Sequence, residues 1–145
     1  MTRGSSFADA KVIEKVNKEF VAVEVNITGT GFPKDVPALK LWERAYDKDP
    51  SFKFGFATSV VIGPGGASPF GTSGCGHTFE WDTSINYHPE KYLKYLDESL
   101  ERYGRAKAIA EDKALGQEER AAKLKEMQAE ILKALQEAAK CRKKQ

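Results

Sequence analysis

A short helix followed by a strand is indicated by the stretch Phe7-Ala-Asp-Ala-Lys-Val-Ile-Glu-Lys-Val-Asn-Lys-Glu-Phe-Val-Ala-Val-Glu-Val25. Asp9 has the side chain of an N-cap residue, because its carboxylate can accept hydrogen bonds from the free N–H groups of the next turn. Apolar residues then recur at helical spacing as far as Lys18. From Phe20 to Ile27, valine and isoleucine alternate with other residues, which is typical of a strand with one buried face.

A second group of elements surrounds the stretch Gly55-Phe-Ala-Thr-Ser-Val-Val-Ile-Gly-Pro-Gly-Gly66. Phe52 to Ile62 is rich in aromatic and β-branched residues and indicates a central strand. Gly63 to Gly66 is a turn, after which Ala67 to Thr72 is expected to return antiparallel. A helix is expected from Asp35 to Tyr46, with Pro37 in its first turn.

These two stretches resemble the thioredoxin-like family, read from partway through its first helix. The resemblance implies an α/β fold: a truncated thioredoxin-like fold, with a mixed sheet flanked by helices and the first strand missing. It covers residues 1–104, ending near Tyr103, and residues 105–145 form a charged helical extension. A further apolar helix face, with Tyr92 and Leu96 among its members, is expected after Pro89.

The same resemblance argues against the family's usual chemistry. The strand that carries the Cys-x-x-Cys pair has no counterpart here, and Ala57 stands where the family has a cis-proline. A cis bond before a residue other than proline costs about 3 kcal/mol, so this bond is expected to be trans. The sequence therefore predicts a redox-inactive domain without a cofactor. The alternative is a fragment of a thioredoxin-like thiol-disulfide oxidoreductase whose Cys-x-x-Cys lies upstream of Met1.

One candidate reactive group is left, the pair Cys75 and His77 in a glycine-rich loop. A histidine-activated thiol needs the imidazole placed on the sulfur, which adjacent spacing does not ensure, and a tetrahedral zinc site needs more ligands. An incidental loop thiol is the favoured interpretation, and no metal site is predicted. Cys141 lies in a basic tail, so a bridge to Cys75 is not expected.

The C-terminal segment has the composition of a solvated helix. Gly116 interrupts it, and Gln117 begins a new helix with a narrow apolar stripe of residues three or four apart. The members of this candidate interaction stripe are Leu124, Met127, Ile131 and Leu135. Three outcomes are open: the helix packs on the core, pairs with a second copy, or binds another protein. The gap left by the missing strand is a second candidate for association, through strand addition.

Composition limits the other classes of function. A net charge of +2 on 145 residues is too small to indicate nucleic-acid binding, and the acidic and basic residues of the last helix are interleaved. No apolar run is long enough to span a membrane. No secretory signal is visible, so the cytoplasm is the default expectation, although many thioredoxin-like relatives are exported. The sequence as a whole predicts a protein-interaction or structural module with a protein partner or self-association.

Overall fold

The computed structural model describes residues 6–23, 59–64, 69–73 and 85–141. Along the chain these contain a 3-10 turn η1 (Ser6–Ala8), helix α1 (Ala10–Glu19), strands β1 (Val60–Ile62) and β2 (Pro69–Thr72), a second 3-10 turn η2 (Ile85–Tyr87), and helices α3 (Pro89–Glu111) and α4 (Gln117–Cys141). The helix expected from Asp35 to Tyr46 lies outside the described residues.

The first helix forms as the sequence predicts. The Asp9 carboxylate accepts hydrogen bonds from the backbone N–H groups of Lys11 and Val12, at 2.9 and 3.2 Å, and so caps α1. The helix ends at Glu19, and the N–H of Phe20 still donates to the carbonyl of Val16. Residues 20–23 then continue without strand pairing.

The predicted antiparallel return is confirmed. Strand β1 pairs with β2, and Val60 faces Thr72 while Val61 faces Gly71. The register shifts between Val61 and Ile62, so that Ile62 faces Pro69. A proline at this position suits the beginning of a short strand, because it cannot donate to the ladder.

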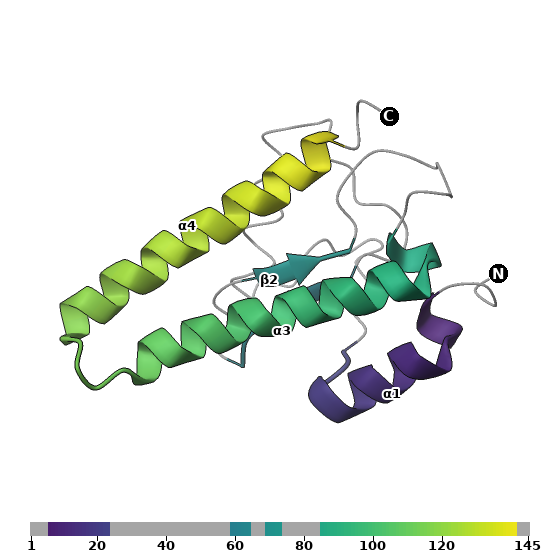
Figure 1. The fold of residues 1–145 in the computed structure, drawn as a ribbon, viewed down its shortest axis with the longest axis horizontal. Helices are drawn as coiled ribbons and strands as arrows, with labels where there is room; N and C mark the ends of the chain where they lie inside the picture. Colours follow the sequence, from purple (N-terminus) through teal and green to yellow (C-terminus); the bar gives the residue numbers. More distant parts are fainter. Residues whose placement is uncertain (1–5, 24–58, 65–68, 74–84, 142–145) are drawn as a thin grey trace, which may run out of the picture.

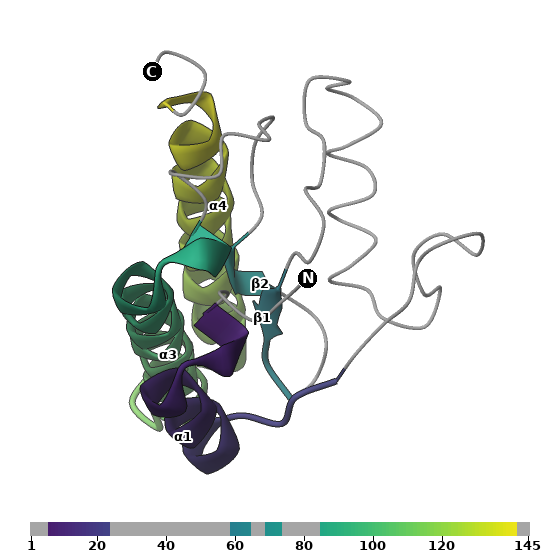
Figure 2. The same ribbon diagram turned by 90° about the vertical axis from the view of Figure 1, so that its right-hand side faces the viewer.

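Helix α3 is the central element. Pro89 occupies its first turn, where a missing N–H costs nothing. The N-terminal half packs against α1, the C-terminal half packs against α4, and β2 contacts the middle of the helix. Figure 1 shows α3 and α4 running antiparallel, joined by a short turn at the end of the molecule away from α1. Figure 2 shows α1, the hairpin and α4 arranged around α3.

Two clusters of buried residues make up the described core. The first joins Val12 of α1 to Tyr92, Tyr95 and Leu96 of α3. The second joins Phe70 of β2 to two residues of α4, Met127 and Ile131. Val61 packs against both clusters, so strand β1 links them.

The predicted mixed sheet of a truncated thioredoxin-like fold is wrong. In the described part of the chain the sheet has two antiparallel strands, and most residues are helical. The alternation of Val21 and Val23 suggested a half-buried strand, yet these side chains are 91% and 77% exposed. Residues 20–23 form no strand, so in this described part the local pattern alone did not produce one. The rest of the strand predicted from Phe20 to Ile27 lies outside the described residues.

The C-terminal helix is part of this core. Met127 and Ile131 keep only 5% and 6% of their surface exposed, because they pack on Phe70 and on the α3 side chains around Tyr103. The domain boundary expected at residue 104 falls inside α3, which continues to Glu111. Of the three outcomes considered for the C-terminal helix, the structure shows packing on the core.

The turn between α3 and α4 is closed by side chains. The Asp112 carboxylate accepts from the N–H of Ala114 at 2.9 Å, a local turn contact typical of aspartate. Arg120 donates to the carbonyl of Ala110 at 3.2 Å and so satisfies one of the free carbonyls at the end of α3. No helix in the described ranges has the length and apolar character needed to cross a membrane.

We predict that Gly71→Ala destabilises the protein by about 1 to 3 kcal/mol. A Cβ at this position would overlap the Ser99 hydroxyl and lie 2.9 Å from the Tyr95 ring, so α3 would have to move off β2. The matched control is Gly104→Ala, which adds the same methyl group to α3 where it meets nothing within 4 Å. That control should gain about 1 kcal/mol from helix propensity. Urea unfolding measures both, and equal effects of the two changes would contradict the close approach.

We predict that Asp9→Ala weakens α1 specifically. Losing the cap costs about 1 kcal/mol, which corresponds to roughly fivefold faster amide hydrogen exchange within Ala10–Glu19. Asp9→Ser keeps an accepting oxygen and should exchange nearly as slowly as the original chain. Hydrogen exchange read by mass spectrometry gives the result, and unchanged protection in the alanine variant would show that the cap is dispensable.

Candidate functional site

The largest convergence of polar side chains in the described residues lies where the two ends of the hairpin meet. Ser59 precedes β1 and Ser73 follows β2, directly beyond the Val60–Thr72 pair. The N–H of Ser73 donates to the Ser59 carbonyl at 2.9 Å, and the N–H of Ser59 donates to the Ser73 hydroxyl at 3.0 Å. The two serine hydroxyls are 2.8 Å apart. Ser59 and Ser73 thus add one further hydrogen-bonded pair to the end of the hairpin.

Two tyrosines of α3 complete this hydroxyl cluster, which consists of Ser59, Ser73, Tyr92 and Tyr95. The Tyr92 hydroxyl lies 2.7 Å from the Ser59 hydroxyl, and the Tyr95 hydroxyl donates to the Ser59 carbonyl at 3.2 Å. The two rings meet edge to face with centroids 5.3 Å apart. The cluster therefore fixes the open end of the hairpin to the N-terminal half of α3.

The electrostatics of the cluster keep Tyr92 neutral. Burial raises the pKa of Tyr92, and the hydrogen bond with Ser59 opposes that effect more weakly. The phenol is therefore a hydrogen-bond donor or acceptor at neutral pH and is not a base. A serine nucleophile needs an adjacent group that removes its proton. Among the described residues the partners of the Ser59 hydroxyl are the hydroxyls of Ser73 and Tyr92, and these contacts join the hairpin to α3.

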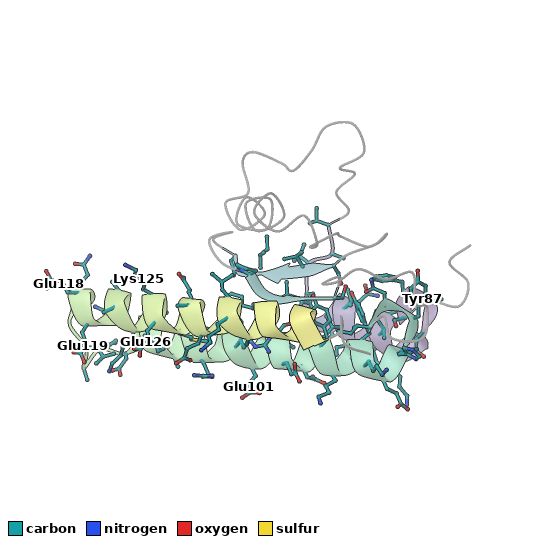
Figure 3. The ribbon with its side chains drawn as sticks, turned by 90° about the horizontal axis from the view of Figure 1, so that it is seen from above. Tyr87, Glu101, Glu118, Glu119, Lys125 and Glu126 are labelled. Carbon is teal, nitrogen blue, oxygen red and sulfur yellow. The ribbon has the colours of Figure 1, made fainter. Side chains whose placement is uncertain are left out.

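The rest of the described chain adds no metal centre. No group of three or more His, Cys, Asp or Glu side chains lies close enough to hold an ion within the ranges that the structure describes. The charged side chains are spread along the outer surfaces of α3 and α4, where Figure 3 labels Glu101, Glu118, Lys125 and Glu126. All four are exposed, as expected for a solvated helix surface.

A second polar contact joins α1 to α3. The Lys15 ammonium lies 2.7 Å from Asp97 on α3 and 3.1 Å from Glu19 on its own helix. The hydrogen bond with Asp97 raises the pKa of Lys15, and desolvation acts in the opposite direction. Asp97 is 63% exposed, so this ion pair is a surface contact.

The predicted site residues are distributed unevenly. Cys75 and His77 lie outside the described residues, as does Ala57. Met127 and Ile131 of the candidate interaction stripe are buried in the core, and Leu124 is half-buried beside them. The side chain of Leu135 is outside the described set. The helix face was predicted correctly, and the structure shows that hairpin and α3 residues of the same chain cover it.

Sequence reasoning missed the serines of the hydroxyl cluster. Tyr92 and Tyr95 were expected on the apolar face of a helix, and both are buried there. The observed antiparallel register, with its shift between Val61 and Ile62, places Ser59 opposite Ser73. The predicted turn alone did not give this pairing, because Ser59 lies closer to Gly63 than Ser73 lies to Gly66. The tertiary contact with Tyr92 had no signal in the sequence.

We predict that Tyr92→Phe reduces the alkaline sensitivity of the fold. Folding raises the pKa of Tyr92, so its stabilising effect is complete below the ordinary tyrosine pKa of about 10 and is lost as the pH rises through the raised value. At pH 7 the variant should be about 1 kcal/mol less stable than the original chain, because it lacks the hydrogen bond with Ser59. Between pH 7 and a pH above 10 its free energy of unfolding should fall by less than that of the original chain.

Urea unfolding from pH 8 to 11 measures the difference. The raised pKa of Lys15 acts in the same pH range, but it is present in both proteins and cancels in the comparison. Tyr103→Phe is the control, since Tyr103 packs at the other end of α3 against Phe70. Parallel pH profiles for the original chain and Tyr92→Phe would contradict the role of the buried phenol.

No protein-family model, curated protein or solved structure matches this chain. The resemblance to the thioredoxin-like family thus has no support from known proteins, and the sheet that it implied is not present in the described structure.

Proposed function

We propose that this protein is a protein-interaction module without catalytic activity. The observation that carries the proposal is the exposure of Val21 and Val23, at 91% and 77%, directly after α1. Single exposed apolar residues are common on proteins, whereas two exposed valines only two positions apart can contact another chain together.

The distribution of polar groups supports the same proposal. Members of the hydroxyl cluster bond to one another, and the pKa of Tyr92 is raised, so its phenol is neutral at pH 7. An enzyme site of ordinary type would bring a base, a nucleophile or a metal-ligand set into a shared space. In the described residues, the polar side chains that come together are those of the hydroxyl cluster, and they stabilise the hairpin.

Burial also changes which surface is available for association. The stripe on α4 is used inside the molecule, because Met127 and Ile131 pack on Phe70. Binding a partner through that stripe would require the core to open. The outward surface of α4 carries mixed charges, including the Lys123–Glu119 pair at 3.3 Å, and such surfaces favour solvation. The valine segment, Val21 to Val23, is therefore the better candidate.

We predict that the double change Val21→Ser and Val23→Ser abolishes association while the fold is retained. Exposed side chains contribute little to stability, so unfolding should change by less than about 0.5 kcal/mol. Sedimentation velocity over a concentration series measures self-association, and affinity capture with the tagged full chain measures binding to other proteins.

The control is the double change Ala121→Ser and Ala122→Ser on the exposed surface of α4. It makes a similar number of apolar-to-hydroxyl changes away from the valines, and association should persist. A monomer at every concentration, together with captured proteins that are identical for the original chain and both variants, would refute the proposal.

A further inference from the structure

We draw no further inference here: the strongest candidate, the surface patch at the start of helix α1 where Phe7 and Ile13 are 42% and 44% exposed, carries nothing because nothing in the described residues shows what covers it.

Discussion

The structure depends on the close approach of strand β2 to helix α3 at Gly71. A side chain there would occupy the space of the Ser99 hydroxyl, which donates to the carbonyl of Tyr95 one turn earlier. Because the Ser99 hydroxyl forms this hydrogen bond within its own helix, the backbone of β2 can pack directly against it. Arg102 holds the same junction from the next turn, by donating to the Phe70 carbonyl at 2.9 Å. A two-stranded hairpin is marginal by itself, so this junction is what makes the hairpin part of a core.

The contact at Gly71 also sets the positions of the other elements. With the strand this close, the Tyr92 and Tyr95 hydroxyls reach Ser59 at the open end of the hairpin. Phe70, the residue before Gly71 in β2, belongs to the buried cluster that also contains Met127 and Ile131 of α4. Helix α3 is consequently shared, with α1 at its beginning and α4 along its end (Figure 1).

The elements that the sequence predicted correctly are those that depend on local chemistry. The Asp9 cap, the start of a helix at Pro89, the break before Gln117 and the antiparallel return each follow from a few adjacent residues. The errors concern partners. Alternation at Val21 and Val23 matched a strand, but burial depends on tertiary packing, and both residues are exposed. The stripe on α4 was visible, whereas its burial on Phe70 depends on residues more than fifty positions away. The hydroxyl cluster was missed for the same reason, since Ser59 and Tyr92 meet only through the tertiary fold.

The two outer helices differ in length and in the contacts that hold them on α3. Helix α4 has 25 residues, and its buried side chains, Met127 and Ile131, belong to the same cluster as Phe70. Helix α1 has fewer than half as many residues, one fully buried apolar side chain and an ion pair that salt screens. Regions with few buried contacts open at lower free energy than the core, and binding surfaces are drawn from them. Displacing α1 would open the first cluster, in which Val12 is buried together with Tyr92 and Leu96. Displacing α4 would open the second cluster around Phe70, so each of the two outer helices closes one half of the described core.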